Sequence, residues 1–511
     1  MTENILANFF MAWTDPQLML VSAIGVFAGI FIGAIPGLSV TMAVSILISF
    51  TFAWDIDMAL ALMVGVFCGG VYGGSRSAVL LNIPGAPSAV ASAFDGYPLA
   101  QRGEAGRAIA LATIVSVMGG FVGVAILAAG APALSQVALL FAQRDYMLLA
   151  LIGLFLVASL STGSTAKGLF CGALGVMIGT VGMDPMTAQH RFTFDNVYLL
   201  GGVHFVVAMI GFFGVAEALY QIRTLHAPVI RQEVRGIMPD FAMIRRHTPL
   251  AMRSSLLGSF IGMLPGAGGD IASLLAYGHA KRSVKNPSRP FGQGAYEGVV
   301  APEAANNGAV GGAYIPMLTL GIPGDAVTAV IIGALFIHGL QPGPLLLENS
   351  PHLFWFTVGN LALANIFLLI FGLIGIRVFT KIVEVPRSVL LPLIIVLSIV
   401  GTYTINSNIY DIYLMLGFGI LGYFFKVYGY PVGPIILGVI LGPLLERSFR
   451  RTVQRVNGDL GEFLLVFLAN PISLVLTLAL VSMVVMQTRW GRSAAAGLTR
   501  RMPRRRPRDG E

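Results

Sequence analysis

Long, almost uncharged runs of apolar residues recur along this chain and restrict its fold more than any other feature. Clear examples are residues 18–35, 147–160, 353–376 and 463–486. A helix needs about 20 apolar residues to cross the hydrocarbon core of a bilayer. Only 11% of the residues are charged, whereas a soluble domain carries about a quarter. We therefore expect an all-α polytopic membrane protein with roughly twelve transmembrane helices.

A pair of Pro-Gly motifs occurs twice in the same order. Pro36-Gly37 is followed by Pro84-Gly85 in the first half, and Pro265-Gly266 is followed by Pro323-Gly324 in the second. Corresponding prolines are 229 (265 − 36) and 239 (323 − 84) residues apart. This repetition divides the chain into an N-terminal transmembrane repeat (1–222), a basic cytoplasmic link (223–253), a C-terminal transmembrane repeat (254–445), a final transmembrane region (446–488) and a basic cytoplasmic tail (489–511).

The loops after these motifs carry opposite charge in the two halves. Loop 51–58 has no Lys or Arg, whereas its counterpart 279–289 has four; loop 95–107 has Arg102 and Arg107, whereas 339–350 has none. Short loops rich in Lys and Arg stay in the cytoplasm. Corresponding loops are therefore expected on opposite sides of the membrane, as in an inverted-topology repeat.

The Pro-Gly pairs interrupt apolar segments, which predicts broken helices or re-entrant hairpins. A bilayer tolerates unpaired backbone groups only where they are buried in protein or line a cavity. Inverted-repeat transporters build their substrate site from such breaks, where helix N-termini attract anions. A single Pro-Gly pair by itself predicts only a kink in a helix, and a nearby Ser or Thr hydroxyl often donates to a backbone carbonyl of its own helix. The predicted substrate-binding residues at the breaks are Pro36, Gly37, Ser39, Thr41, Ser75, Ser77, Asn82, Pro84, Gly85, Pro265, Gly266, Ala267, Gly268, Pro323 and Gly324.

Residues 297–307 form the most polar stretch that leads into an apolar segment. Acids inside a membrane are functional-site hypotheses by default. The side chains that could bind Na⁺ or a proton are Glu303, Asn306, Asn307, Thr319 and Asp325. Two alternatives stay open at this point. Glu297 and Glu303 could face water before the helix enters the bilayer, and Asp325 could be a helix N-terminal acid stabilised by the dipole.

This sequence lacks the motifs that are expected of several other classes of protein. No G-K-[ST] occurs, so the chain has no ATP-hydrolysing motor of its own, and no H-E-x-x-H or Ser-Lys pair predicts catalytic residues. Cys68 and Cys171 lie in apolar segments and indicate neither a disulfide nor a structural metal. Nucleic acid is not an expected partner, because a basic tail after a last span is usually topogenic. The permease subunit of an ATP-driven importer and an intramembrane enzyme remain as alternatives.

Glycines favour close packing in the first span. Gly25, Gly29 and Gly33 recur every four residues, and small residues at that spacing let two helices approach closely in a membrane.

Several longer strings resemble the large membrane subunit of tripartite tricarboxylate transporters, from about Gly25 to about Pro443. They are Tyr72-Gly73-Gly74-Ser75, Leu80-Leu81-Asn82-Ile83-Pro84-Gly85, Asp95-Gly96-Tyr97-Pro98, Gly103-Glu104-Ala105-Gly106-Arg107, Leu264-Pro265-Gly266-Ala267-Gly268, Ala301-Pro302-Glu303-Ala304-Ala305-Asn306-Asn307, residues 318–330 and His338-Gly339-Leu340-Gln341-Pro342-Gly343-Pro344.

The resemblance implies a three-part uptake system of the bacterial inner membrane. A periplasmic solute-binding protein would capture a small organic anion, and a large and a small membrane subunit would carry it inward without a bound cofactor. Substrates of the family are similar in kind: tricarboxylates, dicarboxylates or aromatic acids. The coupling ion would be Na⁺ or H⁺, the C-terminus would be cytoplasmic, and a dimer of the membrane complex is left open.

Two residues depart from the family's pattern. Arg76 stands where an apolar residue is usual, and Asp270 stands where a small or hydroxyl residue is usual. Arg76 could bind a substrate carboxylate with Asp270 as its buried partner, because charges inside membranes tend to pair. Both could instead line a wet cavity without touching the substrate. We count both as substrate-binding candidates.

Overall fold

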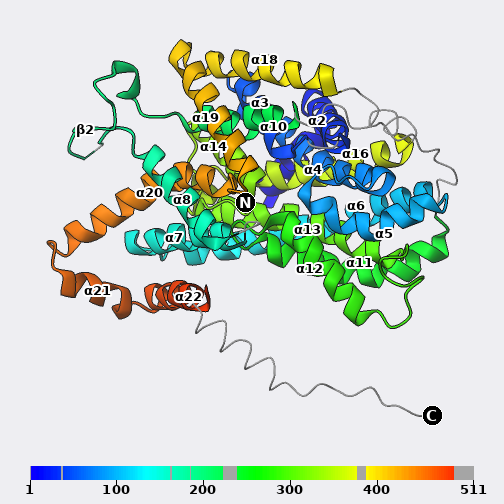
Figure 1. The fold of residues 1–511 in the computed structure, drawn as a ribbon. Coiled ribbons are helices and arrows are strands. Elements are labelled where there is room, and N and C mark those ends of the chain that lie inside the picture. The colour runs from blue at the N-terminus through cyan, green and yellow to red at the C-terminus, as the bar shows by residue number, and fades with distance from the viewer. Residues whose placement is uncertain are drawn as a thin grey trace. The chain divides into compact units, whose positions relative to one another are not determined.

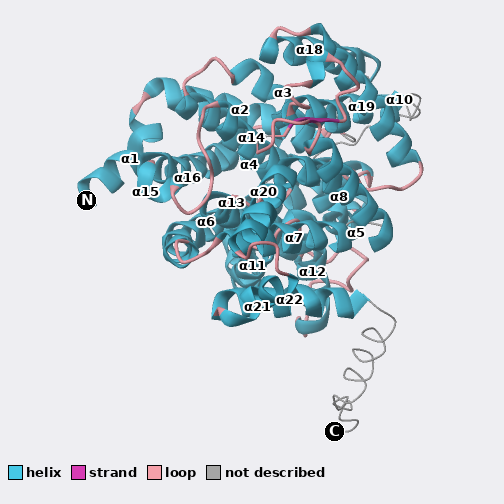
Figure 2. Ribbon diagram, turned by 90° about the vertical axis from the view of Figure 1, so that its left-hand side faces the viewer, coloured by secondary structure: helices cyan, strands magenta, loops and turns pink. Residues whose placement is uncertain are grey.

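The computed structural model describes residues 2–35, 38–160, 164–184, 186–222, 239–376 and 387–487. These residues are almost entirely helical (Figure 2), which confirms the expected all-α class. The chain separates into two compact units. The larger contains Met1–Leu140 and Leu154–Pro443, and the smaller contains Phe141–Gly153 and Leu444–Glu511.

The first half of the sequence, blue to green in Figure 1, forms helices of very different lengths. They are α1 (Thr2–Thr14), α2 (Pro16–Ala34), α3 (Val40–Thr51), α4 (Ile56–Leu81), the 3₁₀ turn η1 (Pro87–Ala89), α5 (Val90–Gln101), α6 (Ala105–Ala138), α7 (Gln143–Leu160), α8 (Thr165–Gly179), the 3₁₀ turn η2 (Val197–Leu199), α9 (Phe205–Met209), the π-helical segment η3 (Ile210–Val215) and α10 (Ala216–Ile222). A two-stranded antiparallel hairpin, β1 (Gly182–Met183) and β2 (His190–Arg191), follows α8.

The second half, green to red in Figure 1, is also helical. Its helices are α11 (Phe241–Gly262), α12 (Gly268–Ser283), α13 (Glu297–Leu320), α14 (Ala326–Ile337), α15 (Leu346–Asn349), α16 (Pro351–Ile374), α18 (Arg387–Asn406), α19 (Ile409–Val427), α20 (Gly433–Arg455), α21 (Leu460–Ala469) and α22 (Pro471–Gln487). The predicted basic link is described only in part: residues 223–238 lie outside the described residues, and residues 241–253 form the first part of α11. The predicted tail 489–511 also lies outside the described residues.

Six described helices are long and apolar enough to cross a membrane, or seven if one bent pair is a single span. The expected number of roughly twelve spans is not confirmed. One reason is that the Pro-Gly breaks leave short helices: α3, α5 and α14 have 12 residues each. At 1.5 Å per residue such a helix covers about 18 Å, too little for a hydrocarbon core of about 30 Å.

The apolar run 463–486 is not one continuous helix, contrary to its appearance in the sequence. Two helices, α21 and α22, meet there at a bend of 100°. The break falls at Asn470-Pro471, where proline lacks an N–H and clashes with the preceding turn. The Asn470 side chain accepts a hydrogen bond from the N–H of Ile472 (2.9 Å) and so begins a new helix.

Two helix pairs, one in each half, pack with their backbones in close contact. In the first pair, a Cβ added to Gly29 or Gly33 of α2 would lie 2.5 or 2.2 Å from a carbonyl oxygen of α4, on Val66 or Gly70. The sequence spacing of glycines in α2 therefore predicted a real contact.

The second pair repeats these contacts at corresponding positions. A Cβ on Gly258 or Gly262 of α11 would lie 2.0 or 2.4 Å from the carbonyl oxygen of Ala305 or Ala309 of α13. Gly258 and Gly262 lie 229 residues after Gly29 and Gly33, and Ala305 and Ala309 lie 239 residues after Val66 and Gly70. These are the same offsets as those of the Pro-Gly motifs. The two halves therefore share both the motif order and the packing register of these helices.

Helices α4 and α13, which hold corresponding positions in the two halves, run in opposite directions where they cross. The ring of Phe67 in α4 lies against that of Tyr314 in α13, with centroids 6.0 Å apart. Further along α4, the carbonyl of Val71 accepts a hydrogen bond from Asn306 Nδ2 (3.3 Å), earlier in α13. Because the partner number falls as the α4 number rises, α4 and α13 are antiparallel.

Candidate functional site

Two of the helices that begin after Pro-Gly breaks, α3 and α14, start with a side-chain cap, whereas η1 and α12 start without one. Ser39 caps α3, and its hydroxyl accepts from the N–H of Met42 (3.0 Å). Asp325 caps α14, and its Oδ1 accepts from the N–H of Thr328 (2.7 Å). Pro36 and Gly37 lie outside the described residues. Asn82 ends α4 with φ 56°, in the left-handed region. The Pro-Gly motifs within the described residues therefore lie between the end of one helix and the start of the next, as the sequence predicted.

The second break of each half packs against the helix that precedes the first break of that half. A Cβ on Gly85 would lie 2.0 Å from the carbonyl oxygen of Gly33, and one on Gly324 would lie 2.7 Å from that of Gly262. Each second motif thus returns to the helix that precedes the first motif of its half. Helix α12 in turn packs against η1 and α5, so that the third break lies next to the second.

Most of the predicted hydroxyl candidates bond to their own helix. Ser75 and Ser77 donate to the carbonyls of Tyr72 (2.7 Å) and Gly74 (3.2 Å), and Thr319 donates to that of Ile315 (2.7 Å). This is the structural role that isolated hydroxyls usually have in helices. Thr41 of α3 is half-buried. A substrate contact for Thr41, Ser75 and Ser77 stays a prediction, as does ion coupling by Thr319.

Glu303 lies on α13 and is fully buried. Its carboxylate accepts hydrogen bonds from Ser92 of α5 (2.5 Å) and Ser116 of α6 (3.2 Å). Among the ion pairs of the described chain, none reaches this carboxylate. A buried carboxylate without a counter-charge is costly, so Glu303 needs a proton or a cation. The alternative that Glu303 and Glu297 simply face water is wrong, because Glu297 is also buried.

Asn306 and Asn307, one turn further along α13, are also buried. Asn306 Nδ2 donates to the carbonyl of Val71, but its Oδ1 is buried without a hydrogen-bond partner. Asn307 Nδ2 donates to the carbonyl of Glu303 (3.1 Å) and borders a small pocket together with Cys68 and Asn365. The Oδ1 of Asn306 is therefore an acceptor still available to a ligand.

Asp325 and Asp270 lie at the starts of α14 and α12. Asp325 forms a reciprocal capping box with Thr328, which confirms that it is a helix N-terminal acid. Asp270 belongs to the first turn of α12 and is close enough to Asp325 for charge repulsion. In the described part of the chain, no group of three or more His, Cys, Asp or Glu side chains could hold a metal ion.

Arg76 of α4 is buried and bonds to helix α16. Its guanidinium donates to the carbonyls of Gly372 (2.7 Å) and Gly375 (3.4 Å) and to the Tyr72 hydroxyl (2.9 Å). These carbonyls belong to the C-terminal end of α16, which attracts cations. Within the described residues no hydrogen bond or ion pair joins Arg76 to Asp270, and a substrate contact for either residue stays a prediction.

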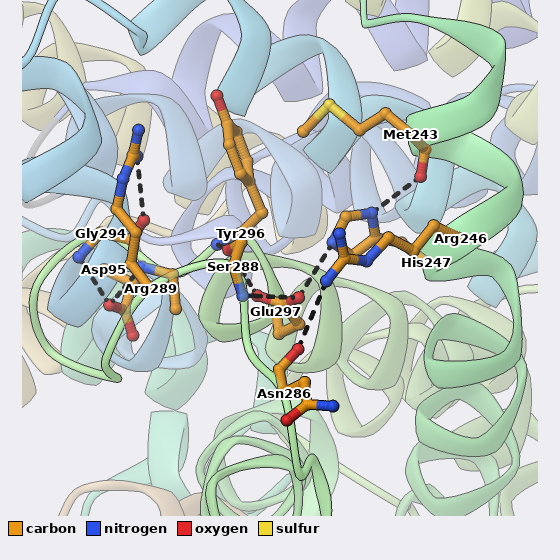
Figure 3. A network of polar contacts seen from close by, with 11 residues as sticks. Asp95, Met243, Arg246, His247, Asn286, Ser288, Arg289, Gly294, Tyr296 and Glu297 are labelled. Atoms are coloured by element: carbon orange, nitrogen blue, oxygen red, sulfur yellow. Dashed lines mark hydrogen bonds and ion pairs between the residues drawn. The ribbon is translucent and has the colours of Figure 1, made fainter.

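A polar network at one end of the helices escaped the sequence analysis (Figure 3). Asp95 is fully buried on α5, and its Oδ1 accepts from the N–H groups of Gly292, Gly294 and Ala295 (2.8–2.9 Å). Its other oxygen accepts from the Tyr277 hydroxyl (2.9 Å). Asp95 thus fixes the loop between α12 and α13. The sequence analysis placed it in a loop, whereas it lies within helix α5.

A second acid of this network binds the same loop. Arg289 donates to both oxygens of Glu104 (2.7 and 3.0 Å), and the Tyr296 hydroxyl adds a third bond (2.6 Å). The hydrogen bonds from Arg289 hold the pKa of Glu104 below its usual value. Glu297 accepts from the backbone and side chain of Ser288, and His247 lies 3.4 Å away. The turn before α6 and the loop before α13 therefore form one polar surface.

The loops without Lys or Arg are neighbours as well. Asp55, in the turn before α4, interacts electrostatically with His338 at the end of α14, and Asp57 interacts with His352 at the start of α16. The two loops rich in Lys and Arg thus lie together, and so do the two loops without Lys or Arg. Each pair contains one loop from each half of the chain.

Comparison with known proteins defines the class of this chain. Residues 19–437 match the profile of the Tripartite tricarboxylate transporter TctA family. The chain belongs to this family, whose members are the large membrane subunits of tripartite transporters. It is therefore a multi-pass membrane protein of a transporter family.

The relatives that it resembles in sequence carry no assigned function. An uncharacterized 52.8 kDa protein in the TAR-I ttuC' 3' region of Agrobacterium vitis is 38% identical over 472 residues, which cover 92% of this chain and 93% of that protein. An uncharacterized protein in the TAR-II ttuC' 3' region of the same organism is 41% identical over 216 residues, 42% of this chain and 87% of that protein. No solved structure matches significantly.

Proposed function

We propose that this chain is the substrate-translocating subunit of a binding-protein-dependent secondary transporter that imports small organic anions. Tricarboxylates, dicarboxylates or aromatic carboxylates are the substrate classes, and Na⁺ or H⁺ supplies the coupling. The observation that carries the proposal is that described breaks of both halves contact α13, which carries a buried acid and an unpaired amide oxygen. The η1 turn after Pro84-Gly85 packs on α13 from the first half, and Gly269 and Gly324 lie against Asn306 and Ala313 from the second. Broken helices of this kind bind anions and coupling cations in inverted-repeat transporters.

Opposite orientation of the two halves in the membrane is part of this proposal. The antiparallel crossing of α4 and α13 supports it, since these helices hold corresponding positions in the repeat. The pairing of loops supports it too. Both loops rich in Lys and Arg meet at the Glu104–Arg289 ion pair, and such loops belong in the cytoplasm.

The location and partners follow from the same proposal. The complex would lie in the inner membrane of a bacterium with the C-terminus in the cytoplasm. A small membrane subunit and a periplasmic solute-binding protein would complete it, as the family's tripartite organisation indicates. The binding protein would deliver the anion to the side opposite the Glu104–Arg289 surface.

Uptake into proteoliposomes tests the function. The chain would be reconstituted with its small subunit, and labelled citrate, succinate and an aromatic acid would each be offered with the binding protein outside. We expect saturable uptake that requires both the binding protein and an inward gradient of Na⁺ or H⁺. Uptake that requires ATP and an added ATPase, or unsaturable uptake without a gradient, would contradict secondary transport.

A further inference from the structure

Acids distinguish the second pair of helix breaks from the first. Asp270 in the first turn of α12 corresponds to Thr41 in α3, and Asp325 before α14 corresponds to Ala86 before η1, at the repeat offsets of 229 and 239 residues. The breaks of the first half therefore contribute hydroxyls and helix N-termini but no carboxylate of their own; the Asp270 carboxylate reaches them from α12 and accepts a hydrogen bond from the backbone of Ser88. Two acids at the second pair oppose an anionic ligand there and favour a cation.

The two acids converge on the same turn of helix. A Cβ placed on Gly268 would lie 2.8 Å from Asp325 Cβ and 3.8 Å from Asp325 Oδ2, and Asp270 follows Gly268 by two residues. The cap of α14 uses Oδ1 of Asp325, through the N–H and hydroxyl of Thr328. The other oxygen, Oδ2, thus faces the start of α12, and Asp270 lies in the first turn of that helix.

An unpaired buried oxygen points at this turn from a third helix. Asn306 is 1% exposed, and its Oδ1 has no hydrogen-bond partner. A Cβ on Gly269, between Gly268 and Asp270, would lie only 2.1 Å from that oxygen. An amide acceptor buried without a donor costs free energy unless a ligand satisfies it. This oxygen cannot serve an anion, because it can only accept hydrogen bonds or coordinate a cation.

We propose that Asn306 Oδ1 and the carboxylates of Asp270 and Asp325 bind a Na⁺ ion at the start of α12. The inference rests on the proposed function, which supplies Na⁺ as one of two coupling ions. Hard cations take oxygen ligands of these kinds. The ion neutralises part of the acidic charge at the second pair of breaks, so that the anion can bind at the breaks of the first half. Glu303 is not a ligand of this site.

Direct binding of ²²Na⁺ to the purified full chain in detergent tests the site without transport. Three variants are compared with the native chain: Asp270→Asn, Asp325→Asn and Asp15→Asn. Asparagine keeps the helix cap at position 325 but removes its charge. Asp15 is the matched control, because it caps α2 through the N–H groups of Gln17 and Leu18. Size-exclusion profiles verify that each variant is folded, and asparagine at position 270 has the size of aspartate and an oxygen that can still accept from the backbone of Ser88.

We expect saturable Na⁺ binding that K⁺ and choline do not displace. Asp270→Asn and Asp325→Asn should each weaken it at least tenfold, and Asp15→Asn should leave it within twofold of the native value. No Na⁺ binding by the native chain, binding unchanged in both site variants, or displacement of Na⁺ by Mg²⁺ or Ca²⁺ at equal concentration would overturn the proposal. Uptake driven by a pH gradient alone would refute the Na⁺ site but leave the transport function intact. Na⁺ binding without uptake under any gradient would support the Na⁺ site but contradict the proposed transport function.

Discussion

Replacing Glu303 with glutamine is expected to reduce gradient-driven uptake at least about tenfold while the protein still folds. Glutamine has the same size; its amide oxygen can accept from one of the two hydroxyls, Ser92 and Ser116, and its NH₂ group can donate to the oxygen of the other. It cannot bind a proton or carry a negative charge. If transport requires the charge of Glu303 to change during the cycle, only the carboxylate supports it.

Glu297→Gln is the matched control for this experiment. It makes the same change on the same helix, at a buried acid that Ser288 and His247 already satisfy. We expect this variant to lose stability but to keep uptake per folded molecule. Wild-type uptake by Glu303→Gln in proteoliposomes would mean that Glu303 only holds α5 and α6 against α13.

Valine at Gly258 or Gly29 is expected to prevent folding of most of the protein. At either position even a methyl group would overlap a backbone carbonyl of the facing helix, at 2.0 Å for Gly258 and 2.5 Å for Gly29. The obstacle is backbone, which cannot rotate away, so the two helices would have to separate. Overpacking of a core costs about 1–3 kcal/mol and occasionally more, and we expect each variant to lie at or above roughly 3 kcal/mol.

Gly417→Val provides the control for both variants. Gly417 lies on the exposed face of α19, and nothing would come within 4 Å of an added Cβ. The monodisperse fraction in size-exclusion chromatography should fall severalfold for Gly258→Val and Gly29→Val but stay unchanged for Gly417→Val. Because the two glycines hold corresponding positions, their effects should be similar. Normal folding of either would contradict the close helix contact in that half.

Local patterns in the sequence predicted the helical class, the breaks and the close packing of α2. These features depend on residues near each other in the chain: apolar runs, Pro-Gly pairs and glycines every four residues. The same local reading failed for the number of spans, because it treated each apolar run as a continuous helix. Pro471 and the Pro-Gly breaks divide several runs into helices too short to cross a bilayer.

Contacts between distant parts of the chain could not be predicted. Asp95 bonds to a loop about 200 residues later, and Ser92 and Ser116 bond to Glu303 across similar distances. Nothing near Asp95 distinguishes it from an acid in a solvated turn. The Asp95-Gly96-Tyr97-Pro98 string of the family resemblance was the one available signal. Arg76 shows the same limit, since its carbonyl partners on α16 lie about 300 residues away.

Opposite orientation of the two halves is the central claim, and cysteine labelling from each side of the membrane tests it most directly. Cys68 and Cys171 are free and buried and would be replaced by alanine. Single cysteines would then be placed at four exposed loop positions, Trp54, Arg102, Lys285 and Gln341.

An impermeant maleimide should label Trp54→Cys and Gln341→Cys in intact spheroplasts, and Arg102→Cys and Lys285→Cys only after lysis. Positions 54 and 285 follow corresponding helices, α3 and α12, so an inverted repeat requires them on opposite sides. Labelling of both from the same side would contradict the inverted repeat and, with it, a substrate site built from the breaks of two oppositely oriented halves.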